Sequence, residues 1–464
     1  MTSWKPDLAS RGGPRYQALA EAIAEAVRVG ELAPGAKLPP QRDLAWKLKV
    51  TVGTVGRAYA LAEQRRLVSG HVGRGTFVLD PAGDPTADTA PDGGVVDLTR
   101  NTPTVSIPAS VLGATLEEMS RMPGLGGFLG YMSEAAERRY RLTASSWMKR
   151  VALDAAPERI VLTCGAQHAL AVALLTLAKP GDTVLTERMT FNGVADAIQL
   201  GGGKPLGVAM DDEGALPEAI DRAARQTGAK LIFLTPTIHS PTTSVMGAKR
   251  RRAVAEVLRA RQMILIEDDV YGYLSKERSA PIAALTPDHT IYIASMSKCM
   301  APGLRVAWLA APPHLVERLT DTLHATTLGL PAFGPEIVAR WIESGTAERI
   351  VDALRAETEL RHGMAAATFR DIRWRGRPDS MHAFVELPES WRAGDFAAEA
   401  ERRGVRICTA AQFAIEPEAA PNAIRVALCA MRDRETLRRA LDVLSALLHA
   451  RPAESAETLR RRVV

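Results

Sequence analysis

The stretch at residues 80–95 constrains the fold most, because it divides the chain into two parts. It reads "DPAGDPTADTAPDGGV" and contains almost no large apolar side chain. Such a segment cannot bury enough apolar surface to pack and is typical of a flexible linker. The chain has 464 residues, about three times the length of a typical domain of roughly 150 residues. We therefore expect a small head at residues 1–79, a large body at 96–450 and a basic tail at 451–464.

The distribution of charge separates the same two parts. Residues 1–80 contain 12 Lys and Arg against 7 Asp and Glu, which accounts for the whole formal net charge of +5. The rest of the chain is neutral. A basic head on a neutral body indicates that the head binds a polyanion, although this signal is weak by itself.

The remaining composition is typical of a cytoplasmic protein. No stretch reaches the ~18 uninterrupted apolar residues of a membrane span. The N-terminus, "MTSWKPDLAS", lacks the apolar core of a signal peptide. The four cysteines lie far apart and show no metal-binding spacing: Cys164, Cys299, Cys408 and Cys429. We interpret them as reduced thiols and expect neither a metal site nor a membrane partner.

The head has the pattern of three helices followed by a hairpin. Residues 14–30 place apolar side chains on one helical face, residues 41–50 read as a short second helix, and a third helix follows a tight break at Val50 and Thr51. The stretch "LVSGHVGRGTFVL" then alternates around three glycines, as two short strands would. This is the plan of a winged helix-turn-helix, α-helical with a small β wing.

In such a head, the third helix enters the major groove with its first residues at the base edges. The candidates at this edge are Thr51, Val52, Thr54 and Arg57. Candidates for phosphate or minor-groove contacts are Arg42 at the start of the second helix and His71 and Arg74 on the wing. The residues alone leave open the alternative that the head is only a packing module.

The head also resembles the GntR family of bacterial regulators, through "PGAKLPPQRDLA", "TVGRAY" and "GRGTFV". The resemblance implies a head that reads double-stranded promoter DNA, with Arg42, Thr54, Arg57 and the wing Gly75 at contact positions. One residue departs from the family pattern, because Val52 stands where an arginine is usual. A valine cannot make the bidentate contact of an arginine with guanine. We therefore expect contact with a thymine methyl group there, or reliance on phosphates.

From residue 96 to 450, short apolar strands alternate with amphipathic helices. Examples are "RIVLTCG" followed by "AQHALAVALLTLA", and the strands "KLIFLTP", "MILIEDD" and "TIYIAS". This alternation predicts an α/β body with a mostly parallel sheet.

The segment "IYIASMSKCMAPGLRVAWLA" places a single lysine, Lys298, between two apolar runs. Burial lowers the pKa of a lysine and makes it a nucleophile, and a Schiff base with a cofactor aldehyde is its main covalent use. Most lysines at strand ends are nevertheless solvated or ion-paired. Lys298 therefore becomes a candidate only together with other stretches of the body.

Two of these stretches lie at the ends of predicted strands. In "VLTCGAQHALAVALL" a glycine turn precedes a helix, so that Gly165, Ala166 and Gln167 would present free backbone amides to an anion. In "ILIEDDVYGYL" Asp268 and Tyr271 follow an apolar strand, where open α/β sheets bind ligands. The alternatives are a plain strand–helix connection in the first case and an acidic helix cap in the second.

Two further residues complete the set. Phe191, in "TERMTFNG", offers a flat face to a ring, although a single aromatic residue is more often core. Arg425 lies inside the apolar strand "AIRVALC" and needs an anion, either a ligand carboxylate or a structural partner.

In this order the motifs of residues 96–450 resemble the fold type I aminotransferases, which bind pyridoxal 5′-phosphate. The resemblance implies a Schiff base at Lys298, Asp268 at the pyridine nitrogen, Tyr271 at the ring hydroxyl, and Phe191 stacked on the ring in place of the usual tyrosine. It places Ser295, Ser297, Arg305 and the amides of Gly165, Ala166 and Gln167 at the phosphate, Tyr131 at the phosphate of a dimer partner, and Arg425 at the ligand carboxylate.

The body departs from the family pattern before Pro241, where Ser240 replaces the asparagine whose amide binds the ring hydroxyl. Ser240 is shorter, so this bond is lost or is made by His239. Thr243 likewise replaces a common glycine. We expect these changes to tune the cofactor rather than exclude it.

A GntR-like head joined to an aminotransferase-like body resembles the MocR subfamily of bacterial transcription regulators. The resemblance implies a head-to-tail homodimer that binds promoter DNA and senses a small amino compound through an aldimine at Lys298. One alternative is an active aminotransferase with an appended DNA-binding head. Another is a body that has lost the cofactor and serves only for dimerisation.

Overall fold

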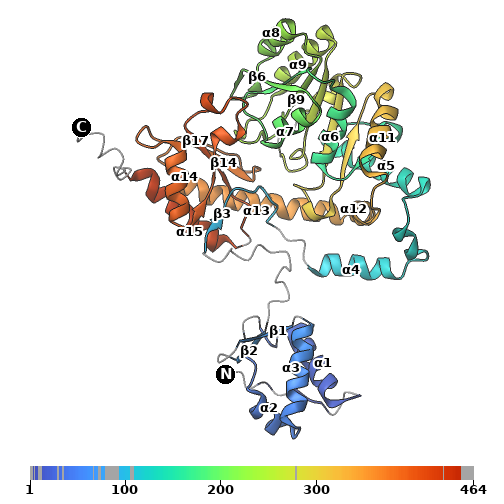
Figure 1. Ribbon diagram of the computed structural model, residues 1–464, viewed down its shortest axis with the longest axis vertical. Coiled ribbons are helices and arrows are strands. Elements are labelled where there is room, and N and C mark those ends of the chain that lie inside the picture. The colour runs from blue at the N-terminus through green and yellow to red at the C-terminus, as the bar shows by residue number, and fades with distance from the viewer. Residues whose placement is uncertain are drawn as a thin grey trace. The chain divides into compact units, whose positions relative to one another are not determined.

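The protein is described by a computed structural model (Figure 1). It describes residues 4, 6–8, 13–28, 31–33, 36–65, 67–71, 75–78, 94–104, 109–276, 279–431 and 433–450. Contacts divide the chain into two compact units, Met1–Pro91 and Asp92–Val464. The predicted tail, and the predicted linker apart from its last two residues, lie outside the described residues.

The head contains the three predicted helices and the hairpin. The helices are α1 (Arg15–Arg28), α2 (Gln41–Leu48) and α3 (Val52–Gln64), and the strands are β1 (Val68–His71) and β2 (Gly75–Val78). Lys49 ends α2 in the left-handed conformation at φ 54°, and the Thr51 hydroxyl caps α3 by accepting a hydrogen bond from the Thr54 amide. These two residues make the tight break between the helices.

The wing depends on one glycine. The two strands pair antiparallel, and His71 lies opposite Gly75 at the turn. Gly75 has φ 113°, and a Cβ atom there would lie 2.6 Å from the Lys37 side chain. Both the backbone angle and the close approach therefore favour glycine at this position.

The body is built on a seven-stranded sheet. In spatial order the strands are β4 (Ile160–Thr163), β12 (Ala307–Ala310), β11 (Thr290–Ser295), β10 (Ile264–Asp268), β9 (Leu231–Leu234), β5 (Thr183–Glu187) and β6 (Lys204–Val208). Only β12 runs antiparallel to its neighbours. The predicted mostly parallel sheet is confirmed.

Helices cover both faces of this sheet. One face packs on α6 (Ala166–Leu177), α7 (Gly193–Leu200) and α11 (Pro313–Thr327). The other face packs on α5 (Glu134–Met148), α8 (Pro217–Thr227), α9 (Ala248–Arg261), α10 (Ile282–Leu285) and α12 (Phe333–Glu343). Successive residues of β11 face opposite ways, since Ile291 and Ile293 join the first face and Tyr292 joins the second. The strands are apolar throughout because both faces are buried.

The C-terminal part of the body forms a second lobe (Figure 1). Its antiparallel sheet has the order β13 (Trp374–Arg375), β14 (His382–Glu386), β17 (Ala423–Ala427) and β16 (Cys408–Thr409). Its helices are α13 (Thr346–Thr368), α14 (Ala393–Arg402) and α15 (Arg434–His449). The segment that follows the predicted linker joins this lobe, because β3 (Val96–Asp97) pairs in parallel with β15 (Val405–Arg406). A small hairpin, β7 (Met210–Asp211) and β8 (Gly214–Ala215), extends from the larger lobe.

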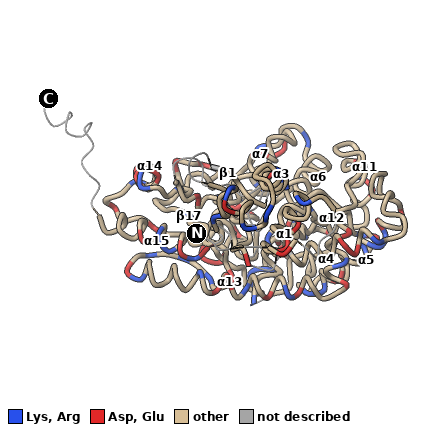
Figure 2. Tube along the Cα trace, turned by 90° about the horizontal axis from the view of Figure 1, so that it is seen from below, with Lys and Arg blue, Asp and Glu red and all other residues tan. Residues whose placement is uncertain are grey.

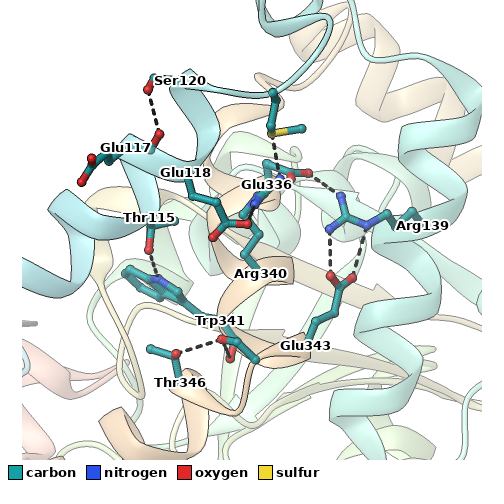
Figure 3. Close-up of polar contacts among 12 residues, drawn as sticks. Thr115, Glu117, Glu118, Ser120, Arg139, Glu336, Arg340, Trp341, Glu343 and Thr346 are labelled. Carbon is teal, nitrogen blue, oxygen red and sulfur yellow. Dashed lines mark hydrogen bonds and ion pairs between the residues drawn. The ribbon is translucent and has the colours of Figure 1, made fainter.

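Helix α4 (Ala109–Ser120) is fastened to α12 by polar contacts (Figure 3). The Trp341 indole donates to the Thr115 hydroxyl at 2.9 Å, and Arg340 pairs with Glu118 and with the buried Glu336. Arg139 of α5 also pairs with Glu336, at 2.6 Å. This network joins α4 to α5 and α12 of the larger lobe.

Charged residues of both signs are interspersed along α5, α13 and α15 (Figure 2). No helix among the described residues is long and apolar enough to cross a membrane. The described residues also contain no cluster of His, Cys, Asp and Glu able to hold a metal ion.

Candidate functional site

The sheet brings most of the predicted body residues to one edge. The parallel strands β4, β5, β9, β10 and β11 all end there, and the antiparallel β12 begins there. Asp268 ends β10, and Ser295 ends the neighbouring β11, three residues before Lys298. Ala307, the first residue of β12, pairs with both Ser295 and Thr163, so the segments that hold Arg305 and Gly165 lie at the same edge as Ser295. Residues distant in the sequence thus meet where open α/β sheets bind ligands.

Lys298 has the electrostatics of a nucleophile. Burial and the positive charge of Arg425 lower the pKa of its ammonium group to about 8, and Asp268 opposes this shift. Its Nζ atom donates a hydrogen bond to the backbone carbonyl of Asn101. A lysine in this environment carries the neutral, reactive amine at a pH where an exposed lysine does not.

This pKa predicts a pH profile for reaction of Lys298 with an aldehyde. The rate should rise roughly tenfold per pH unit below pH 8 and level off above it, because only the neutral amine attacks. In Arg425→Met the inflection should move to higher pH, since one cause of the lowered pKa is removed. Stopped-flow absorbance with pyridoxal 5′-phosphate at a series of pH values measures both. A wild-type inflection near the ordinary lysine pKa of ~10.4 would contradict this account.

Asp268 and Tyr271 lie on the same edge. Burial raises the pKa of Asp268 to about 7, while a hydrogen bond from the Val270 amide and the charge of Lys298 oppose the shift. Burial also raises the pKa of Tyr271 to about 12. A buried carboxyl group with such a pKa gains from any cationic partner placed against it.

The two acids beside Asp268 have structural roles. Glu267 accepts hydrogen bonds from the Ile282 and Ala283 amides at the start of α10 and lies 3.4 Å from Arg251. Asp269 accepts a hydrogen bond from the Tyr292 hydroxyl at 2.6 Å. Glu267 thus accepts hydrogen bonds at the start of a helix, as the helix-cap alternative predicts, and its contact with Arg251 gives it a second structural role.

The predicted phosphate residues form a second group at the start of α6. Gly165 has φ 83°, and a Cβ atom there would lie 2.4 Å from the Arg305 guanidinium. Arg305 also donates to the Cys164 carbonyl at 3.3 Å. Ser295 is fully buried, and its hydroxyl accepts a hydrogen bond from the Ser297 amide at 3.2 Å. A guanidinium thus lies directly against a glycine at a helix N-terminus, which is a favourable place for an anion.

One detail of the sequence prediction is wrong. The amide of Gly165 is not free, because it donates to the Thr163 carbonyl at 3.0 Å. Because this bond spans residues 163 to 165, it depends on the backbone conformation of Cys164, the residue between them. Ala166 and Gln167 are the first residues of α6, and amides in a first helical turn have no acceptor within the helix.

Two glycine-to-alanine variants test whether cofactor binding depends on the close approach of Arg305 to Gly165. In Gly165→Ala the new methyl group should displace the Arg305 guanidinium. The affinity for pyridoxal 5′-phosphate should fall by about tenfold or more, because at least one charge-assisted hydrogen bond is lost. Gly228→Ala is the matched control, because Gly228 also has a positive φ, 71°, with open space around it. Its affinity for the cofactor, measured by fluorescence titration, should stay within about twofold of wild type. Equal losses in both variants would contradict the assignment.

Phe191 lies after β5 and is half-buried. A Cβ atom on Gly193 would lie 2.7 Å from its ring and 3.1 Å from Oε1 of Gln167, so the ring lies close to the start of α6. It also packs against the core on the α6 side of the sheet. Both the ring-stacking prediction and the core interpretation are compatible with this position.

Arg425 comes from the second lobe, on β17. Only 6% of the residue is exposed, and its guanidinium lies 4.7 Å from the centre of the Phe413 ring. It donates to the Thr99 carbonyl and lies 3.6 Å from the Cys408 sulfur, while Nε has no partner within the described residues. No carboxylate of the described residues forms an ion pair with it. A buried guanidinium held only by neutral groups is able to bind an anionic ligand.

The loop after β9 contains the residues that depart from the family pattern. Ser240 is buried and precedes Pro241 in a cis peptide, and Thr243 has φ 62°. The His239 ring makes its contact with the Thr242 hydroxyl at 2.8 Å. Burial lowers the pKa of His239 to about 4, so that its ring is neutral.

Two residues of the site were missed by sequence reasoning. Asn101 donates from Nδ2 to the Tyr271 hydroxyl at 3.1 Å and contacts Nδ1 of His382 at 2.9 Å. Burial lowers the pKa of His382 to about 3, and its ring lies 6.0 Å from that of Tyr271. The sequence gives no signal for Asn101, which follows two other polar residues, Thr99 and Arg100.

Tyr131 does not join these residues within its own chain. It lies between a short 3-10 helix (Leu125–Leu129) and α5, and it is 77% exposed. Leu129, Leu328 and Phe333 are also exposed large apolar residues of the body. The prediction that Tyr131 serves a partner's site stays a prediction.

The predicted DNA-contact residues of α2 and α3 lie on the surface of the head. Arg42, Thr51, Val52 and Arg57 are exposed, and Thr54 is half-buried with its hydroxyl 2.8 Å from that of Thr51. Gly75 lies at the wing turn. Arg74 and the side chain of His71 lie outside the described residues.

Comparisons with known proteins match the two units to two families. Residues 94–444 match the family described as aminotransferase class I and II. Residues 15–78 match the gntR family of bacterial regulatory proteins. The expected fold classes, a GntR-type winged helix-turn-helix and a fold type I aminotransferase body, are confirmed.

Similar proteins include named transcription regulators and, among solved structures, aminotransferases. The HTH-type transcriptional regulator YdeF of Bacillus subtilis is 29% identical, over 96% of this chain and 97% of its own. The vitamin B6 salvage pathway transcriptional repressor PtsJ of Salmonella typhimurium is 30% identical, over 66% of this chain and 69% of its own. Among solved structures, an archaeal alanine:glyoxylate aminotransferase superposes with a TM-score of 0.70 at 24% identity, covering 76% of this chain and 90% of that one.

Proposed function

The chain belongs to the aminotransferase class I and II family and, through its GntR-type head, to the MocR type of transcription regulators, and on this premise we propose that it binds promoter DNA and senses an amino compound at Lys298. The observation that carries the proposal is the meeting of Lys298, Asp268 and Arg425 at one end of the body of a regulator. A scaffold used only for dimerisation would not need these three charged groups in a buried site.

Pyridoxal 5′-phosphate fits the residues present. Arg305 and the start of α6 would hold its phosphate, against a Gly165 that leaves no room for a side chain. Asp268 would pair with the pyridine nitrogen, Tyr271 would bind the ring hydroxyl and Phe191 would stack on the ring. Lys298 would be the point of covalent attachment. When bound, the cofactor supplies an aldehyde carbon that reacts reversibly with primary amines.

The protein residues then decide which amine is held. The guanidinium of Arg425 would bind a carboxylate of the ligand, which favours amino acids and related amino carboxylates over simple amines. The Phe413 ring lies against this guanidinium, and the nearby His382 is neutral, so neither residue neutralises its charge. A ligand can change DNA binding only by having unequal affinity for two states of the body.

The head would bind DNA through the start of α3. Thr51, Val52, Thr54 and Arg57 would face base edges, and Arg42, His71, Arg74 and Gly75 would contact the backbone or the minor groove. We further propose a head-to-tail homodimer, with heads at residues 1–79 on linkers at 80–95. In this dimer the exposed Tyr131 would reach the phosphate held by the partner.

A test of the head uses the full chain and genomic DNA fragments. Fragments retained by the wild-type protein are sequenced, and affinities for one of them are measured by fluorescence anisotropy. Arg57→Ala should weaken binding by about tenfold or more, since one base or phosphate contact contributes roughly 1–3 kcal/mol. Arg15→Ala, an exposed arginine on α1, is the matched control for charge and should change affinity by less than about threefold. Equal affinity of wild type and Arg57→Ala would contradict the assignment of α3.

A second function is favoured by the residue types of the site, because Lys298, Asp268, Tyr271 and Arg425 are all present in the chain. Turnover of an amino acid with a keto acid, measured through the second amino acid that forms, would identify an enzyme with an appended DNA-binding head. The regulator proposal predicts ligand binding that changes DNA affinity with little or no turnover.

A further inference from the structure

One short segment holds two of the charged groups of the site. Lys298 donates to the carbonyl of Asn101, and Arg425 donates to the carbonyl of Thr99. Both carbonyls belong to residues 96–104, which we call the strap. The strap is the part of the body that directly follows the predicted linker to the head.

The strap is fixed to the second lobe at its beginning. The Val96 amide donates to the Gly404 carbonyl at 2.7 Å, and the Leu98 amide donates to the Arg406 carbonyl at 2.8 Å. The Leu98 carbonyl in turn accepts from the Ala427 amide at 3.0 Å. After the strap, α4 is hydrogen-bonded to α12, a helix of the larger lobe (Figure 3). The strap therefore connects the two lobes across the candidate site.

The side chain of Asn101 adds a third contact with the site. It is 7% exposed and bridges the Tyr271 hydroxyl and the His382 ring. Its Oδ1 atom has no hydrogen-bond partner among the described residues. The strap thus contacts the residues proposed to bind the amine, the carboxylate and the cofactor hydroxyl.

The cofactor and the ligand have to compete with these contacts, the cofactor for Lys298 and the ligand carboxylate for Arg425. A lysine whose nitrogen is bonded to a cofactor loses its ammonium donors, and a guanidinium that pairs with a carboxylate in bidentate fashion has fewer donors left for a neutral carbonyl. A buried carbonyl left without a donor costs roughly 1–3 kcal/mol. The carbonyls of Thr99 and Asn101 must then find new donors or reach water, and the strap must move.

We propose that the strap is an internal competitor of the ligand and transmits its binding to the head. Attachment of the cofactor would occupy Lys298, which leaves the Asn101 carbonyl without its donor, and a ligand carboxylate would then take Arg425 from the Thr99 carbonyl. The strap shifts on β15, and the end of the linker, which adjoins the strap, shifts with it. Loss of the ligand returns Arg425 to the strap. This inference rests on the proposed function, because it assumes that a carboxylate-bearing amino compound binds at Lys298 and Arg425.

A reversible disulfide can hold the strap in place. Cys408 lies beside Thr99, since its sulfur is 3.8 Å from the Thr99 carbonyl and both residues stand three positions beyond the paired Val96 and Val405. In Thr99→Cys, oxidation should join the two sulfurs across neighbouring strands, which mass spectrometry verifies. The probe is N-(5′-phosphopyridoxyl)-L-alanine, a stable molecule that combines the phosphate, the ring and a carboxylate.

Calorimetry on the full chain measures the affinity for this probe in both redox states. The oxidised Thr99→Cys protein should bind it about tenfold or more weakly than the reduced protein, a coupling of ordinary size, and only the reduced protein should change its DNA affinity with the probe. Thr99→Ser, treated identically, should bind equally in both states. Equal probe affinity of oxidised and reduced Thr99→Cys overturns the role of the strap while leaving the proposed function intact. Absence of probe binding to the wild-type protein overturns both.

Amide hydrogen exchange provides a second test without a variant. In the wild-type protein the probe should accelerate exchange of the Val96 and Leu98 amides, whose acceptors lie on and beside β15. Pyridoxamine 5′-phosphate, which lacks the carboxylate, should have a smaller effect because it leaves Arg425 on the strap. Unchanged exchange of these amides with bound probe overturns the proposal.

Discussion

Replacing Lys298 by alanine should abolish the covalent attachment of pyridoxal 5′-phosphate and every response of DNA binding to amino compounds. Alanine has no amine, and among the groups placed at this edge only Lys298 combines a nucleophilic nitrogen with a pKa lowered to about 8. The visible absorbance band of a lysine-bound cofactor should be missing at all cofactor concentrations. DNA binding without ligand should be preserved, since the head forms its own compact unit.

The control is Lys204→Ala, which removes an exposed lysine from β6 of the same sheet. It should keep the absorbance band and the ligand response of the wild-type protein. Persistence of either in Lys298→Ala would show that the cofactor or the effector binds elsewhere.

Arg425→Met should separate carboxylate recognition from cofactor binding. Methionine fills a similar space without charge, so the affinity for amino carboxylates should fall by about 2 kcal/mol or more, a factor of roughly 30. Attachment of pyridoxal 5′-phosphate should persist, because its proposed phosphate and ring contacts do not include Arg425. Titration with L-alanine and with ethylamine, followed by absorbance, measures both effects.

The comparison of these two amines is the internal control for Arg425→Met. The wild-type protein should prefer the amino acid, and the variant should lose that preference while binding ethylamine as before. An unchanged preference would assign Arg425 to a structural role, as a buried guanidinium that holds the strap through Thr99.

The sequence predicts the arrangement of strand-end residues well because a parallel sheet gathers strand ends at one edge. Asp268 and Ser295 each end an apolar strand whose limits can be read from composition, so their meeting follows once the strands are placed side by side. The three helices and the wing of the head are likewise local patterns, marked by the Thr51 cap and by Gly75.

Contacts between distant segments could not be predicted in this way. Asn101 reaches Tyr271, and Thr99 reaches Arg425, only because β3 pairs with β15 in the second lobe. Two-residue strands carry no periodic signal that would reveal such a pairing. The Gly165 amide was expected to be free because its hydrogen bond to Thr163 closes a three-residue turn through Cys164, which the residue types do not reveal.

The position of Asn101 also bears on the departure at Ser240. Before Pro241, Ser240 replaces the family's asparagine, whose amide binds the ring hydroxyl of the cofactor. In this structure the amide of Asn101 donates instead to the hydroxyl of Tyr271, the residue proposed to bind that ring hydroxyl. We expect Asn101→Ala to raise the pKa of Tyr271, because the hydrogen bond from this amide lowers it. A pH titration of tyrosine absorbance, compared with Tyr271→Phe to assign the signal, measures the change. A Tyr271 pKa that stays the same or falls would contradict this role.

The most direct measurement is the visible absorbance spectrum of the purified full chain, recorded as pyridoxal 5′-phosphate and then single amino compounds are added. The regulator account predicts a band that appears with the cofactor, shifts with one class of amino carboxylate and then stays, because the ligand is held and not converted. A band that bleaches and returns with a keto acid would identify an aminotransferase. Absence of any band from the wild-type protein would contradict the central claim that Lys298 holds a cofactor.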